Sequence, residues 1–355
     1  MTGLTLQVLP GDGIGPEIMT STVEIVAEAA RAEAVPVTFE HDRIGFEAYE
    51  AEGTTCPDRV LARAREVAGT LLGPISHLDY PPRDKGGVNV SAAFRVKLDL
   101  YANIRPARTR PGIGHVRQDF DVVIVRECTE GFYPDRNMAV GSGEFMPTPD
   151  VALSVRKITA FACERIARRA FELARRRRRK VTAVHKANNF ILTDGLFLAQ
   201  TREVAKAFPD VQLEEIIIDA MAAHLVRDAS RYDVILATNF YADILSDLAS
   251  ELSGGLGLAG SINANETICA AQAQHGSAPD IAGEDRANPT SMILSAAMLF
   301  DWLGETRQDV RLAAVGARLH RAVEATLGDP TTRTRDLGGT LGTHAFGKAV
   351  VAALG

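Results

Sequence analysis

The stretch Leu4-Thr-Leu-Gln-Val-Leu-Pro-Gly-Asp-Gly-Ile-Gly-Pro16 decides the fold class of this chain. Residues 4–9 form a short apolar run typical of a buried strand, and residues 10–16 form a glycine-rich turn. Residues 17–34 have the pattern of a helix, and Pro16 stands near its first turn, where proline is tolerated. The chain therefore opens with a strand, a tight turn and a helix.

The same alternation continues along the chain. Further buried strands are predicted at 35–40, 70–73, 121–126, 181–185, 212–219 and 232–238. Helices are predicted at 154–178, 194–207 and 243–252. Strands that alternate with helices predict an α/β protein whose sheets are covered by helices.

The composition is that of an ordinary globular protein, and the charge and hydropathy argue against a nucleic-acid or membrane protein. The chain has 355 residues, enough for two domains, and its net charge of −6 gives no case for nucleic-acid binding. We see no signal peptide and no apolar run long enough to span a membrane. The four cysteines are widely spaced and form no C-x-x-C motif. We therefore expect a cytoplasmic enzyme without a disulfide framework or a structural zinc site.

Two segments depart from the alternation of strands and helices. Residues 134–149 are rich in Gly, Pro and Met and lack periodicity, so we expect an arm or a lid. The basic run Arg175-Arg-Arg-Arg-Arg-Lys180 falls at the end of a predicted helix, where cations meet the macrodipole favourably. A solvated helix end therefore explains this run better than a nucleic-acid patch.

A pair of carboxylates, Asp243 and Asp247, lies in the segment Thr238-Asn-Phe-Tyr-Ala-Asp-Ile-Leu-Ser-Asp-Leu-Ala249. Like charges four residues apart on a helix repel each other at a cost of roughly 0.2–0.5 kcal/mol. A hard divalent cation reverses that sign, because two carboxylates on one helical face are ready ligands for Mg²⁺ or Mn²⁺. A solvated acidic face is the alternative.

Other charged side chains stand at the ends of predicted strands. Arg126 ends an apolar strand, and there it would point into the crevice where α/β proteins bind ligands. Arg95, Arg105 and Arg126 could together grip carboxylates, or they could be three surface arginines. Lys186 closes another strand, and a desolvated lysine beside other cations has a lowered pKa and can act as a base. Asp219 ends a third strand, so these groups and the carboxylate pair would meet at one edge of a sheet.

A loop rich in Gly and Pro, Gln274-His-Gly-Ser-Ala-Pro-Asp-Ile-Ala-Gly283, comes late in the chain and is followed by Asn288-Pro and a helix. Backbone amides in such a loop can hold phosphates, and a nearby Asp can accept from ribose hydroxyls. A plain turn is the alternative. The turn at 11–17 nearly matches the dinucleotide fingerprint, but its third glycine comes one residue early. It predicts only a tight turn close to a ligand.

Nine stretches together resemble one family, the β-decarboxylating dehydrogenases of isocitrate, homoisocitrate, 3-isopropylmalate and tartrate or D-malate. They occur in the family order from residue 6 to about 350. The stretches are Gly11-Asp-Gly-Ile-Gly-Pro-Glu17, Leu98-Asp-Leu-Tyr-Ala-Asn-Ile-Arg-Pro106, Val125-Arg-Glu-Cys-Thr-Glu-Gly131, His185-Lys-Ala-Asn188, Asp194-Gly-Leu-Phe-Leu198, Asp243-Ile-Leu-Ser-Asp-Leu248, Gly254-Gly-Leu-Gly257, His275-Gly-Ser-Ala-Pro-Asp-Ile-Ala-Gly283 and Asp336-Leu-Gly-Gly339.

The resemblance implies an isocitrate/isopropylmalate dehydrogenase-like α/β fold, which is not a Rossmann fold and has two α/β domains that share a large mixed sheet. Residues 1–100 with 255–355 would form a cofactor-side domain. Residues 101–254 would form a substrate and dimerisation domain, with an arm near 134–150. The implied enzyme is a homodimer with shared active sites, or a tetramer.

The resemblance also implies a role for each candidate residue. Tyr133 would be the general acid, and Lys186 would be the base in the partner subunit's site. Asp219, also from the partner, would join Asp243 and Asp247 around Mg²⁺ or Mn²⁺. The residues that would bind the substrate are Asn89, Ser91, Arg95, Arg105, Arg126 and Asn188. The residues that would hold NAD are His275, Gly276, Ser277, Ala278, Asp280 and Asn288.

The implied reaction is the oxidative decarboxylation of a 3-substituted D-malate. Lys186 would take the C2 hydroxyl proton as hydride leaves for NAD⁺, and Tyr133 would protonate carbon after CO₂ departs. Asp280 followed by Ile281 should accept ribose hydroxyls and repel a 2′-phosphate, which favours NAD⁺ over NADP⁺. The alternatives are a tartrate or D-malate dehydrogenase and, in another class, a non-catalytic regulatory subunit, which should have lost a catalytic or metal-binding residue.

The sequence departs from the family pattern in places. Gln272 stands where many members have Glu, Ala220 replaces a frequent Asn, and Cys128 replaces Asn. Asn89 and Ser91 resemble the Ser and Asn of isocitrate enzymes, where isopropylmalate enzymes tend to present leucines. A polar C3 substituent is therefore favoured.

Overall fold

The computed structural model describes residues 3–114 and 119–355 and divides into two compact units. The first unit comprises Met1–Asp99, Pro111–Ile113 and Gly254–Gly355, and the second comprises Leu100–Arg110 and Gly114–Ser253. The sequence predicted boundaries after residues 100 and 254, and the main changes between units come after residues 99 and 253. The roles assigned to the two domains stay predictions.

The strands of the first unit follow the order β2-β1-β3-β12-β11. β1 pairs in parallel with β2 and β3, and β3 pairs in parallel with β12, whereas β11 and β12 are antiparallel. Side chains on both faces of β1 are buried, which is why the apolar run that opens the chain predicts a central strand. The strands are β1 (Leu4–Leu9), β2 (Val37–His41), β3 (Gly69–Leu72), β11 (Ile262–Ala264) and β12 (Cys269–Gln272).

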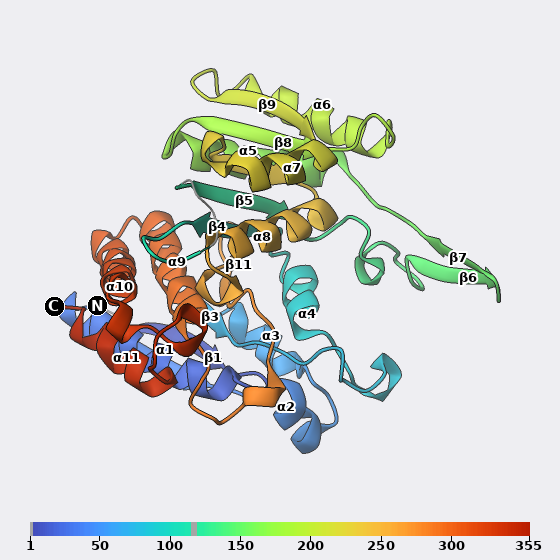
Figure 1. The fold of residues 1–355 in the computed structure, drawn as a ribbon. Helices are drawn as coiled ribbons and strands as arrows, with labels where there is room; N and C mark the ends of the chain where they lie inside the picture. Colours follow the sequence, from blue (N-terminus) through green and yellow to red (C-terminus); the bar gives the residue numbers. More distant parts are fainter. Residues whose placement is uncertain (1–2, 115–118) are drawn as a thin grey trace. The chain divides into compact units, whose positions relative to one another are not determined.

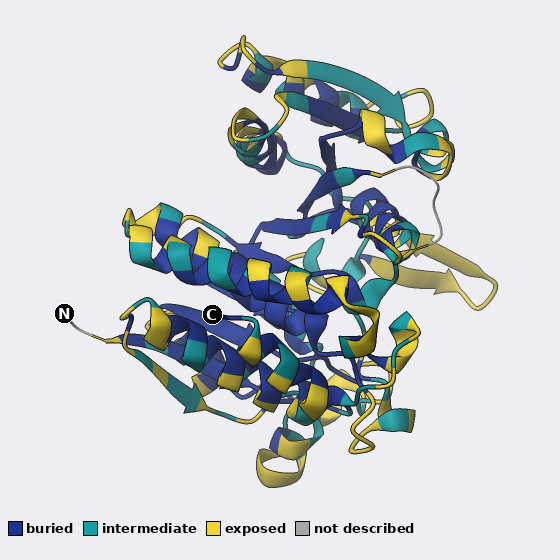
Figure 2. Ribbon diagram, turned by 60° about the vertical axis from the view of Figure 1, so that its left-hand side comes forward, coloured by how far each residue is buried: buried dark blue, intermediate teal, exposed yellow. Residues whose placement is uncertain are grey.

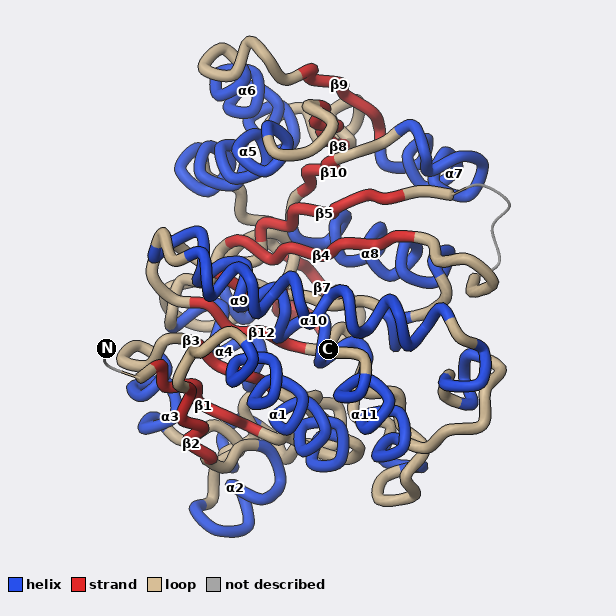
Figure 3. The backbone as a smooth tube through the Cα atoms, turned by 90° about the vertical axis from the view of Figure 1, so that its left-hand side faces the viewer, coloured by secondary structure: helices blue, strands red, loops and turns tan. Residues whose placement is uncertain are grey.

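Helices of the first unit pack against one another and against these strands. α1 contacts α9, α10 and α11, and α9 lies against β11 and β12 (Figure 3). α9 is buried on nearly every side through its first 11 residues (290–300), so its apolar pattern is continuous rather than confined to one face. The helices are α1 (Gly15–Ala32), α2 (Gly45–Glu52), α3 (Asp58–Ala64), α4 (Val90–Lys97), α9 (Thr290–Arg307), α10 (Val310–Gly328) and α11 (Thr343–Ala352).

The strands of the second unit follow the order β4-β5-β10-β8-β9. β4 is antiparallel to β5, and the other neighbouring pairs are parallel. The strands are β4 (Ala102–Arg108), β5 (Asp121–Glu127), β8 (Lys180–His185), β9 (Gln212–Ile217) and β10 (Val234–Ala237).

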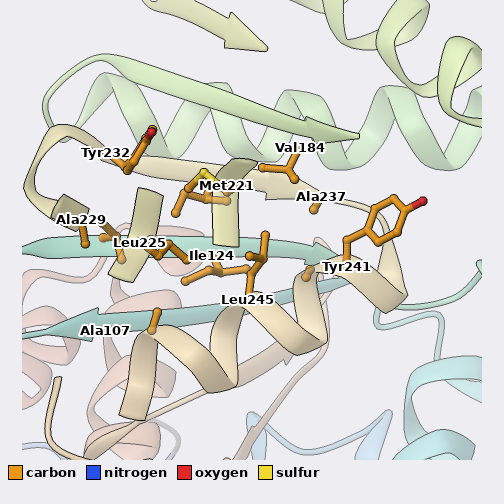
Figure 4. Packing of buried hydrophobic residues seen from close by; sticks show 14 of the residues in the cluster. Ala107, Ile124, Val184, Met221, Leu225, Ala229, Tyr232, Ala237, Tyr241 and Leu245 are labelled. Atoms are coloured by element: carbon orange, nitrogen blue, oxygen red, sulfur yellow. The ribbon is translucent and has the colours of Figure 1, made fainter. Parts of the chain in front are cut away.

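Helices cover both faces of this sheet. α5 and α6 lie on one side of it, and α7 and α8 lie on the other (Figure 3). Figure 4 shows the core beneath α7 and α8, where Leu225, Leu245 and Ile124 come from α7, α8 and β5. The helices are α5 (Ala160–Arg175), α6 (Thr193–Ala205), α7 (Ile218–Asp228) and α8 (Asn239–Ser253). The predicted α/β architecture of mixed sheets covered by helices is confirmed.

The predicted arm contains an antiparallel hairpin of β6 (Glu144–Thr148) and β7 (Val151–Ser154). The hairpin extends away from the rest of its unit (Figure 1), and every residue in both strands is exposed (Figure 2). Because no side chain of the hairpin is buried, the sequence shows no alternation of apolar and polar residues there.

Several predicted boundaries were wrong. The helix predicted to begin at Ser154 begins at Ala160. Ser154 is the last residue of β7, and Thr159 caps the helix through its hydroxyl. Asp219 does not end a strand but lies in the first turn of α7, where a carboxylate is favoured by the helix dipole. α8 begins at Asn239, earlier than predicted.

The basic run after α5 is neutralised by carboxylates. Arg175 pairs with Asp210, and Arg177 pairs with Asp121 and Asp233 at 2.7–2.8 Å. These ion pairs agree with the prediction of a solvated helix end. No helix within residues 3–114 and 119–355 is both long and apolar enough to cross a membrane.

Candidate functional site

The carboxyl ends of four neighbouring parallel strands lie along one edge of the second unit's sheet. The register places Arg126 opposite Ala237, Ala237 opposite Val184, and His185 opposite Ile217. Residues at or just beyond these ends therefore share that edge, as the sequence predicted.

Asp243 is the centre of a hydrogen-bonded cluster at this edge. Its Oδ1 accepts from Nη1 of Arg105 at 3.1 Å and from Nη1 of Arg126. Its Oδ2 accepts from the Tyr133 hydroxyl at 2.6 Å. Asp247, one turn further along α8, lies 3.3 Å from Arg105 Nη1 and is about half-exposed. The structure thus brings five of the predicted site residues together.

Neutral side chains fix the two arginines in this cluster. Arg105 Nε donates to Asn103 Oδ1 at 2.6 Å, and its Nη1 also donates to Ser246 Oγ at 2.7 Å. Arg126 donates from Nε and Nη2 to Asn239 Oδ1 at 2.9 and 2.8 Å. Sequence reasoning missed Asn103, Asn239 and Ser246, although all three stand inside quoted stretches.

Burial also changes the electrostatics of the cluster. The side chains of Arg105 and Arg126 are 8% and 2% exposed. Burial lowers the pKa of Arg105 to about 10, and the nearby Arg126 charge acts in the same direction. The two buried guanidinium groups offer forked donors of the kind that bind carboxylates.

The ring of Tyr133 faces two guanidinium groups, and its hydroxyl donates to Asp243. The guanidinium of Arg126 lies 5.8 Å from its ring centroid, and that of Arg136 lies 5.3 Å from it. Its hydroxyl therefore has a fixed position at the strand edge.

Lys186 follows β8 and pairs with Asp219 of the same chain. Its Nζ lies 2.5 Å from both carboxylate oxygens of Asp219, and this hydrogen bond lowers the pKa of that carboxyl. Within one chain the neighbour of Lys186 is therefore an anion, and a lysine beside other cations stays a prediction for the partner subunit's site. Asn188 is exposed and donates to Asn189 Oδ1.

The backbone of Lys186 is anchored by a buried ion pair. Asp194 Oδ2 accepts from the Lys186 amide at 2.5 Å, and Asp194 Oδ1 lies 2.5 Å from Arg156 Nη1. Arg156 also lies over the rings of Phe132 and Tyr241, 5.0 and 5.1 Å from their centroids. Sequence reasoning quoted Asp194 in a motif but gave it no role.

The predicted metal ligands divide into two groups within the chain. Asp243 and Asp247 converge on one face of α8, whereas Asp219 pairs with Lys186. Across residues 3–114 and 119–355 no three His, Cys, Asp or Glu side chains meet in a way that could hold a metal. The pair on α8 nevertheless fits a hard divalent cation, because both carboxylates already accept hydrogen bonds from the Arg105 guanidinium group.

In the first unit, three predicted substrate residues lie on or beside α4. Asn89 caps the helix, since its Oδ1 accepts from the Ala92 amide at 3.0 Å. Ser91 Oγ accepts from Gln272 Nε2 at 2.6 Å. Arg95 Nε donates to Asn263 Oδ1 at 2.9 Å.

The loop predicted to hold the cofactor rests on the glycine turn that opens the chain. Ile14 N donates to Ser277 O at 2.8 Å, and the Ser76 and Ser277 hydroxyls are 2.7 Å apart. A Cβ added to Gly13 would lie 2.1 Å from Ser277 O, and Gly13 has a φ of +58°. The turn is therefore a support for this loop, in keeping with a tight turn close to a ligand.

His275 is partly buried in this loop. Burial lowers its pKa, and Nδ1 lies 2.8 Å from the carbonyl oxygen of Gly276. Because a carbonyl only accepts, Nδ1 carries the proton and Nε2 is left as an acceptor. Nε2 is buried without a hydrogen-bond partner in the described part of the chain.

The other predicted cofactor residues differ in exposure. Asp280 is exposed at the loop's surface. Asn288 is buried, its Oδ1 accepts from Thr290 N at 3.0 Å, and its Nδ2 donates to Asp336 Oδ2 at 2.9 Å. Sequence reasoning gave Asp336 no role, although its motif was quoted.

Known proteins match this chain along nearly its whole length. The profile of the isocitrate/isopropylmalate dehydrogenase family matches residues 5–350. The chain is 42% identical over 348 residues to the isocitrate/homoisocitrate dehydrogenase of Thermus thermophilus, which covers 98% of this chain and 97% of the relative. It is 40% identical over 338 residues to a probable mitochondrial isocitrate dehydrogenase (NAD) subunit alpha of Caenorhabditis elegans, covering 94% of this chain and 87% of the relative.

Solved structures agree with these matches. The isocitrate dehydrogenase from Methylococcus capsulatus has a TM-score of 0.87 to this chain at 37% identity and covers 99% of both chains. Other relatives carry the name 3-isopropylmalate dehydrogenase. The names of the relatives therefore agree on the family and differ on the substrate.

Proposed function

The chain belongs to the isocitrate/isopropylmalate dehydrogenase family, and on that premise we propose that it oxidatively decarboxylates a 3-substituted D-malate, using NAD⁺ and Mg²⁺ or Mn²⁺. Family membership makes it an oxidoreductase. The observation that carries the rest is the Asp243 cluster, in which a carboxylate, two buried arginines and a tyrosine hydroxyl meet.

The residues of this cluster and Lys186 would each have a distinct role in the reaction. Arg105 and Arg126 present guanidinium donors that would bind substrate carboxylates. Lys186, with its backbone fixed by Asp194, would accept the C2 hydroxyl proton as hydride passes to NAD⁺. Tyr133 would deliver a proton to carbon once CO₂ has left.

A divalent cation would be held by Asp243 and Asp247, with Asp219 from a second subunit, and would supply Lewis acidity at the C2 oxygen. The pair on α8 already receives hydrogen bonds from the guanidinium of Arg105. That arrangement shows carboxylates oriented toward positive charge.

The cofactor proposal rests on the loop that carries His275. Its neutral Nε2 is a buried acceptor, which suits an exocyclic amine such as that of adenine. Asp280 is exposed and would accept from the ribose hydroxyls while repelling a 2′-phosphate. The name of the Caenorhabditis elegans relative includes NAD, which supports NAD⁺ rather than NADP⁺ as the cofactor.

The prediction that the substrate's C3 substituent is polar is supported by the residues at the start of α4. Asn89 and Ser91 both present polar side chains there. The Thermus thermophilus relative is named for isocitrate and homoisocitrate, whose C3 groups carry a carboxylate. A tartrate or D-malate dehydrogenase is the second candidate within the same reaction class.

We also propose that the working form is a homodimer in the cytoplasm. Asp219 is not grouped with the α8 pair in the single chain, so a second copy is needed to complete the proposed metal site. All four cysteines are free and buried, as suits a reducing compartment.

A substrate panel tests the proposal. Initial rates of NADH or NADPH formation would be measured with isocitrate, homoisocitrate, 3-isopropylmalate, D-malate and tartrate, with and without Mn²⁺. We expect turnover of at least one substrate, a higher kcat/KM with NAD⁺ than with NADP⁺, and loss of activity in EDTA that Mn²⁺ restores. Full activity in EDTA would contradict the metal role.

Substitution of the carboxylate pair gives the matching residue test. Asp243→Asn and Asp247→Asn should each lower kcat by about 10²-fold or more, because the cation loses a ligand. Asp247→Asn should keep the folded state, because that side chain is about half-exposed. Asp243→Asn removes the counter-ion of two buried arginines and should also lower the free energy of unfolding. Asp210→Asn makes the same chemical change on the surface beside Arg175 and should leave kcat unaltered.

A further inference from the structure

We infer that Arg156 is a positioning residue for the proposed reaction. One buried guanidinium group holds the chain segments that carry Tyr133, Lys186 and Asp243, and its loss should slow the chemical step more than it weakens substrate binding. The inference rests on the proposed function, which gives those three residues their roles. The side chain of Arg156 is only 6% exposed, so it acts through its neighbours.

The first neighbour of Arg156 is the carboxylate that fixes the backbone of Lys186. Arg156 Nη1 lies 2.5 Å from Oδ1 of Asp194, which is fully buried. The other oxygen, Oδ2, accepts from the Lys186 amide at 2.5 Å. Loss of Arg156 would leave a buried carboxylate without this counter-ion, and such a carboxylate moves toward another donor or takes up a proton. Either change would alter the support of the Lys186 backbone.

The second neighbour is the start of α8, the helix that carries Asp243. Arg156 Nη2 donates to Thr238 Oγ1 at 3.0 Å, and Thr238 directly precedes the helix. The Thr238 carbonyl accepts from the Ala242 amide at 3.0 Å, so Thr238 takes part in the first turn of α8. Two nitrogens of one planar group therefore fix both the segment of Lys186 and the start of the helix that carries the proposed metal ligands.

Aromatic rings form another part of the surroundings of Arg156. Its guanidinium group lies 5.0 Å from the ring centroid of Phe132, 5.3 Å from that of Phe190 and 5.1 Å from that of Tyr241. A planar, delocalised cation is attracted to aromatic faces and can donate from its edge at the same time. Phe132 directly precedes Tyr133 in the chain. The segment of the proposed general acid is therefore held by the same guanidinium group.

Stability alone does not account well for this buried ion pair. Desolvation of two charges offsets much of their attraction, so apolar residues of similar size are often at least as stable in the same place. Apolar side chains at positions 156 and 194 could fill the space, but they could not donate to Thr238 or accept from the Lys186 amide. The charged pair adds a defined geometry at the strand ends.

Single-turnover kinetics test the inference. With enzyme in saturating excess over NAD⁺ and a panel substrate that the wild type uses, all NAD⁺ is bound to folded enzyme. The rate constant of NADH formation then does not depend on the folded fraction. Arg156→Met should lower it roughly tenfold or more, because small displacements of reacting groups have effects of that order. Arg156→Lys keeps a charge for Asp194 but loses the planar fork, so its rate constant should fall between those of wild type and Arg156→Met.

Steady-state kinetics separate positioning from binding. The KM for the hydroxy acid should change by a smaller factor than kcat, because the proposed carboxylate-binding groups of Arg105 and Arg126 are held by other side chains. A double variant, Arg156→Met with Asp194→Asn, separates positioning from folding. It leaves no buried charge at this pair, and its asparagine oxygen can still accept from the Lys186 amide. It should therefore fold and still have a lowered rate constant.

Arg168→Met is the matched control, because it breaks an exposed ion pair with Glu164 on α5 and should leave the rate constant unchanged. Thermal unfolding shows which variants are folded. Wild-type rate constants in the folded Arg156→Met and double variants would overturn the inference. If neither folds, a wild-type rate constant in Arg156→Lys would overturn it. A wild-type enzyme that turns over no member of the panel would instead reject the proposed function itself.

Discussion

At the scale of single residues, Asn89 serves two purposes that a substitution can separate. Its Oδ1 caps α4 by accepting from Ala92 N, and the helix carries Arg95. Asn89→Ala should lower the free energy of unfolding by about 1 kcal/mol, because a cap is lost. Asn89→Ser keeps an oxygen for the cap and should lower it much less.

Chemical denaturation of wild type, Asn89→Ala and Asn89→Ser measures the differences in the free energy of unfolding. The kcat/KM for isocitrate measures the second proposed role of Asn89, which is to donate a hydrogen bond to the substrate. If the Asn89 amide contributes a donor to the substrate, Asn89→Ser should lose affinity while keeping stability. Equal stability of Asn89→Ala and wild type would refute the capping role. Replacing Asn89 with Leu to favour isopropylmalate would remove the cap as well, so Ser91 is the cleaner position for that experiment.

The residue scale also shows how far the sequence predicts the site. Arg126 could be expected to meet a ligand or a charged partner, because it ends an apolar strand. Its neutral partner could not be predicted. Asn239 lies 113 residues away and meets Arg126 only because α8 packs on β5, which a single sequence does not specify. The Gln272 contact was hidden for the same reason, since its partner Ser91 is 181 residues away.

At the scale of elements, the glycine turn after β1 supports the proposed cofactor loop rather than a cofactor directly. Gly13→Ala would place a methyl group 2.1 Å from Ser277 O at a φ of +58°. The loop must move, so we expect the KM for NAD⁺ to rise by more than the KM for the hydroxy acid. Steady-state kinetics with each substrate varied in turn measures the two effects.

Gly53→Ala is the matched control for this prediction. Gly53 has a φ of +74°, but a Cβ there would meet no atom within 4 Å. The control therefore reproduces the backbone strain, about 1–2 kcal/mol, without the collision. If Gly53→Ala raised the KM for NAD⁺ as much as Gly13→Ala, the contact with Ser277 would have no special role.

Elements were predicted well where burial imposes a pattern and poorly where it does not. β1 was predicted with its observed bounds because it is apolar throughout and central in its sheet. The hairpin of β6 and β7 is fully exposed, so nothing in its sequence marked the strands. The start of α5 was misplaced because the exposed residues of β7 and Val155 have no apolar periodicity that would separate them from the helix.

At the scale of the whole molecule, the hairpin is an argument for a second copy of the chain. A two-stranded hairpin alone is marginally stable in water. This one exposes Phe145, Met146 and Leu153 by 45%, 62% and 47%. α8 likewise exposes Phe240 and Ile244 by 41% and 49%. Apolar surface on an arm and on the helix that bears the carboxylate pair is typical of an interface between subunits.

The resemblance implied shared active sites, but one chain's sequence cannot show which residues cross between subunits. Lys186 and Asp219 are paired in this chain, so they would enter a neighbour's site together. The prediction therefore needs an experiment in which two differently tagged variants form a purified heterodimer.

A heterodimer of Lys186→Ala with Asp243→Asn should recover activity that neither homodimer has. One of its sites would take Asp243 from the first chain and Lys186 from the second, so both groups would be intact there. A heterodimer of Lys186→Ala with Asp219→Asn is the control and should stay inactive, because each site would receive both residues from one chain and one of them would be defective. No activity in the first heterodimer would mean that Lys186 acts within its own chain, and activity in the control would mean that Lys186 and Asp219 serve different sites. NADH formation by tag-verified heterodimers decides between these arrangements.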